Sequence, residues 1–150
     1  MPLATTQIPR RVVLDTNVVL DWLVFDDPRC DRLQAELSRG RAAVATHKLA
    51  VEELRRVLAY TKLALSVACQ ATVLARYLEF AQEVDTPSGF SATELLLPPR
   101  FPRCRDRDDQ FLLALAYHGR ADFLLTRDKR LLELARRARA FGVNIGNIDR

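Results

Sequence analysis

Asp15 is the first residue of this sequence whose type and position suggest chemistry. Three apolar residues, Val12 to Leu14, run directly into it, and an apolar helical pattern starts immediately afterwards. A short apolar run closed by polar residues predicts a buried parallel strand, and open α/β sheets bind ligands at the carboxyl ends of such strands. Asp also caps helices well, so this stretch alone leaves a role in a site and a capping role equally open.

Three more carboxylates lie at comparable places. Asp128 follows an apolar strand at 122–126, just as Asp15 follows the first strand. Asp109 lies on the inward face of the helix that continues through 111–117, and Glu53 lies at the edge of the apolar stripe of a helix at 48–60. Burying an unpaired charge is costly, so these positions suggest a polar site. For Glu53 alone, a solvated or salt-bridged side chain beside an Arg remains the alternative.

Four carboxylates that converge at one sheet edge would repel each other strongly in a cleft of low dielectric constant. Such a cluster is tolerable when cations are present, and hard oxygen ligands select Mg²⁺ or Mn²⁺. One or two of these ions suit hydrolysis of a phosphodiester bond, because they activate the attacking water and stabilise the leaving oxygen. Neither His47 nor His118 is well placed to take part. Candidates for holding the flanking phosphates, most of them equally compatible with solvated surface, are Arg56, Arg105, Arg107, Arg127 and Lys129.

The segments that must position these residues alternate between strand and helix patterns. Strands are expected at 11–14, 42–45, 122–126 and 143–148, and helices at 18–23, 28–39, 48–60, 63–84, 111–117 and 131–140. Residues spaced for burial in the helix at 63–84 are Val67, Ala71, Leu74, Leu78 and Ala81. Prolines and a glycine exclude a continuous helix between Asp85 and Cys104, where we expect an irregular loop. The alternation predicts an α/β fold with a parallel sheet.

Length and composition bound the class of protein. At 150 residues, the chain is expected to form one domain, residues 1–150, with its core at about 10–148. No apolar run approaches the length of a membrane span, and Met1 to Arg10 carries no secretory signal pattern. Three widely spaced cysteines match neither a disulfide framework nor a zinc site, so we expect a reducing, cytoplasmic setting.

The charge balance is basic, with a formal net charge of +4. Only Lys48, Lys62 and Lys129 are lysines among the 23 basic residues, so arginine dominates. Arginine holds phosphate groups in a bidentate fork, which suits a nucleic-acid partner. A GC-rich genome would produce the same bias, and a charge of +4 is too small to establish nucleic-acid binding.

Four motifs in this order resemble the PIN-domain family over roughly residues 10 to 148. They are Val-Val-Leu-Asp15-Thr16-Asn17, Glu53-Leu54-Arg55-Arg56-Val57-Leu58, Asp106-Arg107-Asp108-Asp109-Gln110-Phe111-Leu112, and Leu-Leu-Thr126-Arg127-Asp128-Lys129-Arg130-Leu131-Leu132. Each motif is weak alone, but the set is specific. The chain is most similar to the small single-domain branch described as toxins of toxin–antitoxin pairs.

The resemblance implies a three-layer α/β/α sandwich around a central parallel sheet and a metal-dependent ribonuclease that prefers single strands. It also implies a frequent homodimer and, often, an antitoxin that occludes the site. Asp15, Glu53, Asp109 and Asp128 match the family's acidic quartet, and Asp106 matches an additional acid of this branch. Asn17 and Thr126 match polar supports that would orient the metal ligands.

Two other classes of function remain alternatives. The first is a catalytically silent PIN-like module that binds RNA or a protein; four mutually repelling acids argue against it. The second is a phosphoryl-accepting domain, which also places an Asp after its first strand. It is disfavoured because Asn17 stands where such phosphatases need a second Asp, and because Lys129 follows Asp128 directly.

Overall fold

A five-stranded sheet in the order β3-β2-β1-β4-β5 forms the centre of the computed structural model, which describes residues 8–148. All four pairs of neighbouring strands are parallel. The strands are β1 (Arg10–Leu14), β2 (Ala42–Thr46), β3 (Ala81–Glu83), β4 (Phe123–Leu125) and β5 (Ile145–Gly146). Parallel strands buried on both faces need continuous apolar runs, which is the pattern seen at Val12 to Leu14 and at Ala42 to Ala45.

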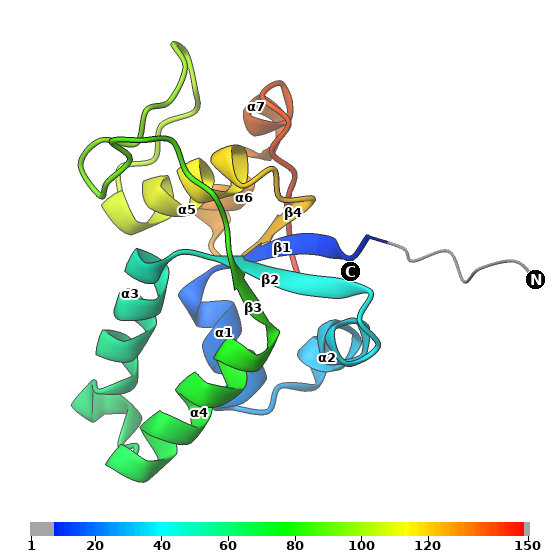
Figure 1. The fold of residues 1–150 in the computed structure, drawn as a ribbon, viewed down its shortest axis with the longest axis vertical. Helices are drawn as coiled ribbons and strands as arrows, with labels where there is room; N and C mark the ends of the chain where they lie inside the picture. Colours follow the sequence, from blue (N-terminus) through cyan, green and yellow to red (C-terminus); the bar gives the residue numbers. More distant parts are fainter. Residues whose placement is uncertain (1–7, 149–150) are drawn as a thin grey trace, which may run out of the picture.

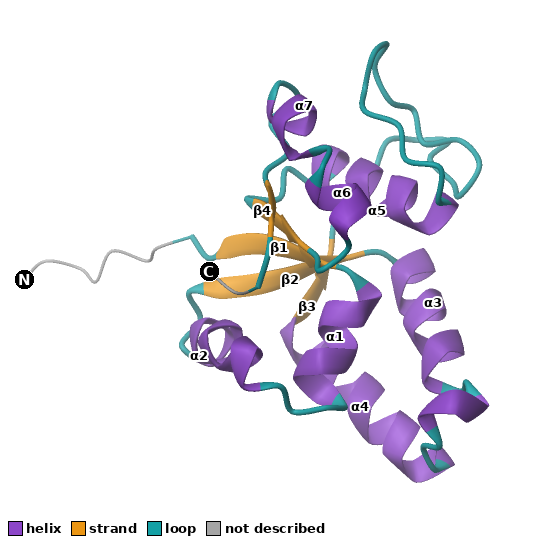
Figure 2. Ribbon diagram, turned by 180° about the vertical axis from the view of Figure 1, so that it is seen from behind, coloured by secondary structure: helices purple, strands orange, loops and turns teal. Residues whose placement is uncertain are grey.

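Helices cover both faces of this sheet (Figures 1 and 2). Val12, Leu14 and Val44 point into one apolar core, whereas Val13, Ala45 and Leu124 point into the other, because successive side chains of a strand alternate between faces. On the first face lie α1 (Thr16–Leu23), α2 (Asp31–Ser38), α3 (Lys48–Leu58) and α4 (Val67–Phe80). On the second face lie α5 (Arg107–His118), α6 (Lys129–Leu132) and α7 (Ala135–Arg139). This arrangement confirms the predicted three-layer α/β/α sandwich.

The direction of the chain reverses beside β1. From β1 the chain proceeds to β2 and β3 on one side, and it then returns to place β4 and β5 on the other side. The carboxyl ends of β1 and β4 are therefore neighbours, and the backbone N–H of Asp15 donates to the carbonyl oxygen of Leu125 at 3.0 Å. Ligands of open α/β sheets bind in the crevice that such a reversal creates.

The prediction of one helix from Leu63 to Val84 is wrong at both ends. A 3₁₀ turn at Thr61–Leu63 stops at Ala64, whose φ of 51° breaks the helical path, and α4 begins only at Val67. Residues 81–83, which were expected to form the last turn of the helix, form the strand β3 instead and pair with β2 at the edge of the sheet. Three residues are too short a run for a strand pattern to appear in the sequence.

The predicted buried face of this helix is also wrong in large part. Val67 and Leu78 are 82% and 46% exposed, while the buried residues of α4 are Val73 and Tyr77. Leu74 does pack against the core as expected. The error has a physical cause: small and apolar residues occur all around this helix, so the spacing fits more than one face.

Two elements near the carboxyl terminus are shorter than predicted. The expected helix at 131–140 consists of α6 and α7, which are separated at Glu133 and Leu134. The expected strand at 143–148 is reduced to β5, Ile145–Gly146. Most of Met1 to Arg10, where no secretory signal was expected, lies outside the described residues. No helix within residues 8–148 is long and apolar enough to cross a membrane.

The segment between Val84 and Asp106 is irregular, as predicted from its prolines, and aromatic contacts fasten it to the body. The ring of Phe90 lies 5.4 Å from that of His47 and 5.5 Å from that of His118, centroid to centroid. The His118 ring also hydrogen-bonds the carbonyl oxygen of Leu95 at 2.8 Å. This loop therefore has a defined place beside the carboxyl end of the sheet.

Candidate active site

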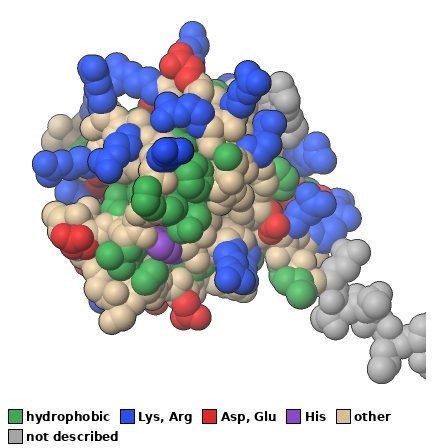
Figure 3. Space-filling view, turned by 90° about the horizontal axis from the view of Figure 1, so that it is seen from above, with side chains coloured by type: hydrophobic (Ala, Val, Ile, Leu, Met, Phe, Trp, Pro, Cys, Tyr) green, Lys and Arg blue, Asp and Glu red, His purple; other side chains and the backbone are tan. Residues whose placement is uncertain are grey.

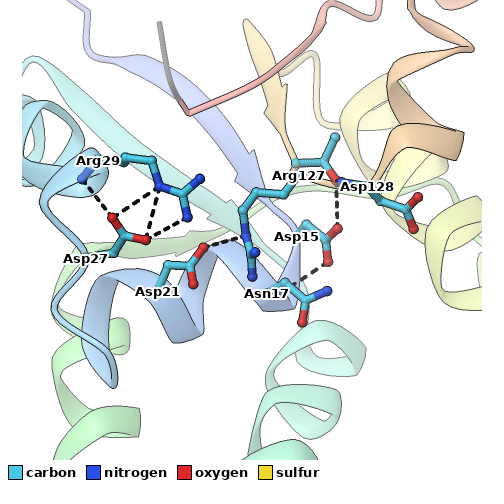
Figure 4. Close-up of polar contacts among 8 residues, drawn as sticks. Asp15, Asn17, Asp21, Asp27, Arg29, Arg127 and Asp128 are labelled. Atoms are coloured by element: carbon cyan, nitrogen blue, oxygen red, sulfur yellow. Dashed lines mark hydrogen bonds and ion pairs between the residues drawn. The ribbon is translucent and has the colours of Figure 1, made fainter.

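Asp15 lies at the end of β1 with only 6% of its surface exposed. Its Oδ2 accepts a hydrogen bond of 2.8 Å from the hydroxyl of Thr126, and its Oδ1 accepts one of 3.4 Å from the backbone N–H of Asn17 (Figure 4). The second bond caps α1, so Asp15 performs the capping role and also faces the crevice. Asn17 makes this contact through its backbone N–H, and the supporting role expected for Asn17 stays a prediction.

Thr126 connects Asp15 to Asp128. It is fully buried at the end of β4, and its hydroxyl oxygen also accepts a 3.0 Å hydrogen bond from the backbone N–H of Asp128. Asp128 in turn caps α6, because its Oδ1 accepts from the N–H of Arg130 at 2.8 Å. One hydroxyl group thus contacts both the carboxylate of Asp15 and the backbone of Asp128.

Asp109 is buried in the first turn of α5, and this agrees with the inward face predicted for it. Its Oδ2 accepts a weak hydrogen bond from the thiol of Cys104, at 3.7 Å. Asp106 is exposed and caps the same helix, since its Oδ1 accepts from the N–H groups of Asp108 and Asp109. Asp108 is exposed, so burial favours Asp109 over its neighbour as the site residue.

The electrostatic environment of these acids is repulsive. The pKa of Asp109 is raised to about 7, first by burial and then by the negative charges of Asp106, Asp15 and Asp128. The pKa of Asp15 is also raised, first by burial and then by Asp128, against the lowering effect of the Thr126 hydrogen bond. The charges of Asp15 and Asp128 therefore act on Asp109, and the charge of Asp128 acts on Asp15.

Glu53 reaches the crevice from α3 on the opposite side. Its Oε2 forms an ion pair of 2.5 Å with Arg56, one turn further along the helix. The predicted position at the edge of the apolar stripe is correct, since the Glu53 side chain is 22% exposed. The alternative considered for Glu53, an ion pair with an Arg, is also present in the structure.

A pocket of about 300 Å³ lies at the carboxyl end of β1. Its acidic lining consists of Asp15, Glu52, Glu53, Asp108 and Asp109, and Arg56 and Arg107 are its basic residues. Ala92 and Thr93 of the irregular loop form another part of the wall. Asp106 and Asp128 are absent from this lining, although both influence Asp109 electrostatically.

The predicted basic residues fall into three groups. Arg56 and Arg107 line the pocket, whereas Arg105 lines a separate hollow with Arg103 and Arg130. Lys129 is exposed and lines neither of these two pockets, and Arg127 forms an ion pair with Asp21. Figure 3 shows many Lys and Arg side chains around an apolar patch on the face that lies uppermost in Figure 1.

Within residues 8–148, no group of three or more His, Cys, Asp or Glu side chains is arranged so that it could hold a metal ion. The donor set nevertheless fits a hard divalent cation, because the acids at the crevice offer carboxylate oxygens and repel one another. His47 is occupied otherwise, since its Nδ1 accepts from the N–H of Leu49 and caps α3.

The sequence interpretation missed several residues around the site. Asp21 is buried in α1, and helical spacing could have revealed it, because it follows Val18 by three positions on the apolar face. Gln110 holds the end of the loop against α5, accepting from the N–H of Cys104 and donating to the carbonyl oxygen of Pro102. No local sequence pattern predicts the two hydrogen bonds of Gln110, because the packing of a loop is not periodic.

The fold and the crevice define an α/β protein with an acidic site at the reversal point of a parallel sheet. The sequence matches the PIN domain family over residues 11–130, and the chain belongs to that family. The fold is similar to that of the VapBC2 structure from Rickettsia felis, which was solved bound to a DNA fragment from its promoter. The TM-score is 0.60 at 15% identity, over 91% of this chain and 98% of that chain. No protein with curated annotation matches the chain.

Proposed function

We propose that this protein is a metal-dependent endoribonuclease that hydrolyses RNA phosphodiester bonds. Membership of the PIN domain family supports this proposal, because PIN domains are generally nucleases that use divalent metal ions. The observation that carries it is a group of acids at one crevice, where the pKa of Asp109 is raised to about 7, first by burial and then by the charges of Asp106, Asp15 and Asp128. Buried like charges destabilise the free protein, and a bound cation offsets that repulsion.

Asp15, Glu53, Asp106, Asp109 and Asp128 are the proposed ligands of one or two Mg²⁺ or Mn²⁺ ions. When bound, such an ion supplies positive charge and Lewis acidity at the scissile phosphodiester. Thr126 orients Asp15 through its hydroxyl, and the N–H of Asn17 fixes the other oxygen of the same carboxylate. The acids must draw together around the ion, because they are not grouped closely enough as they stand.

Arg56 and Arg107 are the proposed phosphate contacts nearest to the reacting bond, because both line the pocket with the acids. Arg105 and Lys129 lie further out and suit flanking phosphates. Guanidinium groups bind phosphate oxygens in pairs, and this contact is independent of base identity. A preference for single-stranded RNA is what the resemblance to the PIN-domain family implies.

The same proposal makes the protein the toxin of a toxin–antitoxin pair that acts in the cytoplasm as a homodimer. The support is the fold shared with the VapBC2 structure and the resemblance of the motifs to the toxin branch of the family. An antitoxin that covered the acidic pocket would block access of RNA. Growth arrest on induced expression of the parent, but not of Asp15→Asn, tests this part.

A catalytically silent module that binds RNA or protein is the alternative function. The observation in its favour is that no three candidate ligands within the described residues are grouped to hold an ion. The two functions differ in their need for Asp15, since a silent module would bind its partner equally well with Asn in that position.

Cleavage of single-stranded RNA with and without metal is the decisive experiment. We expect the protein to degrade a labelled RNA in Mg²⁺ or Mn²⁺ and to be inert in EDTA. Asp15→Asn is the matched control, because Asn retains the helix cap while it removes the charge. Equal cleavage by the parent and by Asp15→Asn would refute the site assignment.

A further inference from the structure

Arg56 and Arg127 are both predicted phosphate contacts that form ion pairs, but the partner of Arg127 is buried and lies on another segment of the chain, whereas Arg56 pairs within its own helix. The Nε of Arg127 lies 2.5 Å from Oδ2 of Asp21, and the Asp21 side chain is only 6% exposed. Figure 4 shows the Arg127 side chain extending away from the Asp128 carboxylate, across the end of β1, to reach α1. The ion pair therefore connects the segment after β4 to the first helix, over 106 residues of sequence.

Arg127 stands between two residues of the candidate site. On one side, the Thr126 hydroxyl holds Asp15 at 2.8 Å, and on the other side the backbone N–H of Asp128 returns to the same hydroxyl at 3.0 Å. A side chain that fastens Arg127 to α1 consequently limits how far this three-residue segment can move. Asp15 caps the same helix α1, so both ends of the connection belong to the structure that holds the strand-end acids.

Because Asp21 is buried, its carboxylate depends on the charge of Arg127. Burial raises the pKa of Asp21, and the nearby Arg127 charge lowers it. Asp27 and Arg29 also act on Asp21, but they form an ion pair with each other at 2.7 Å on the surface. Loss of Arg127 would leave a buried carboxylate without its direct partner, which costs far more than loss of a surface ion pair.

We propose that the Asp21–Arg127 ion pair is a positioning device for the metal-binding acids, and that Arg127 is not a phosphate contact. The inference rests on the proposed function, because it concerns the same acids. It assigns Arg127 the task of holding Thr126 and Asp128 in place beside Asp15. Residues that orient metal ligands in this way affect ion affinity without touching the ion.

The three possible roles of Arg127 predict different measurements. A positioning residue affects ion affinity, even when RNA is absent. A phosphate contact affects the KM for RNA and the salt dependence, but it leaves ion affinity unchanged. A purely stabilising residue lowers the melting temperature and leaves both affinities intact at temperatures where the protein is folded.

Titration of the RNA-free protein with Mn²⁺, by calorimetry, separates these roles. The variants are Arg127→Gln, Asp21→Asn and the double variant, with Arg127→Lys as the conservative replacement. Arg41→Gln is the matched control, because it removes an ion pair of 2.7 Å with Glu36 that lies away from the crevice. Arg127→Gln leaves the buried Asp21 carboxylate unpaired and could unfold the protein. Asp21→Asn breaks the same ion pair without leaving a buried charge, so it tests the inference in a folded protein.

We expect Asp21→Asn and Arg127→Gln each to weaken Mn²⁺ binding by about 10-fold, and the double variant to be no weaker than either. Arg127→Lys should recover part of the affinity, and Arg41→Gln should match the parent. Parental Mn²⁺ affinity in folded Asp21→Asn and Arg127→Gln would overturn the inference. So would a parent with no Asp15-dependent Mn²⁺ binding. A parent that binds Mn²⁺ but cleaves no RNA would refute only the proposed function.

Discussion

The two sides of the crevice at the carboxyl end of the sheet hold their acids in different ways. On the strand side, Asp15 and Asp128 are fixed by the register of β1 and β4, and the buried Thr126 hydroxyl bonds both. On the helix side, Glu53 is held by an ion pair with the exposed Arg56. Pairs of this kind on a helix surface contribute only about 0.3–0.5 kcal/mol, so Glu53 is free to change partner.

Asp109 belongs to neither group. It is buried like Asp15, but its one side-chain hydrogen bond in the described structure comes from a thiol, and the surrounding charges are negative. The three sets of acids therefore differ in how they are held. Asp15 and Asp128 on the strand side are fixed, Asp109 is buried among negative charges, and Glu53 can change its ion-pair partner.

The largest expected effect is the difference between Asp15→Asn and Glu53→Gln. We expect Asp15→Asn to reduce RNA cleavage by more than about 100-fold and Glu53→Gln by roughly 10-fold, because of these two proposed ligands only Asp15 is held in place by the sheet. Initial rates at saturating Mg²⁺ measure both. Raising the Mg²⁺ concentration should partly restore Glu53→Gln but not Asp15→Asn.

Arg56→Gln is the control for this comparison. It removes the ion-pair partner of Glu53 and leaves the carboxylate in place. If Arg56→Gln lost as much activity at saturating RNA as Glu53→Gln, the Arg–Glu pair itself would be the functional unit, and the adjustable role of Glu53 would be wrong.

A second prediction concerns the stability of the metal-free protein as a function of pH. The pKa of Asp109 is about 7 in the folded protein, above the value near 3.9 of an unfolded chain. The folded state therefore binds this proton more tightly, and the resulting contribution to the free energy of unfolding is complete below about pH 4. That contribution is lost as the pH rises through 7. Asp109→Asn should therefore be more stable than the parent by roughly 2 kcal/mol at pH 8 and no more stable at pH 4.

Urea denaturation in EDTA at pH 4, 6 and 8 measures this difference. Asp108→Asn is the matched control, because Asp108 is the exposed neighbour on the same turn of α5. A stability gain for Asp109→Asn that was the same at all three pH values would contradict the role assigned to its charge.

The smallest expected effect belongs to the arginines of the pocket. Arg107→Gln should raise the KM for RNA about threefold and reduce the slope of log affinity against log salt by about 0.7, as for one lost phosphate contact on a single strand. Lys129→Gln should have a weaker effect, because Lys129 is not part of the pocket lining. Equal effects of the two substitutions would place the RNA path outside the pocket.

Local patterns were sufficient for much of the fold. The runs before Asp15 and Thr46, the helix at Lys48–Leu58 and the irregular segment after Val84 were all predicted, because periodicity and proline content report neighbouring positions. The strand β3 and the exposed side of α4 were not predicted, because a three-residue strand and an evenly apolar helix carry no clear period.

The sequence by itself determined the chemical types at the crevice and their place at strand ends, since an apolar run that stops at an acid is a local signal. Only the tertiary structure decided how the strand-end acids are held: that Thr126 joins Asp15 to Asp128, and that Arg127 faces Asp21. The physical reason is that these contacts join segments up to 111 residues apart. Their distances depend on how helices pack on the sheet, which no single stretch of sequence specifies.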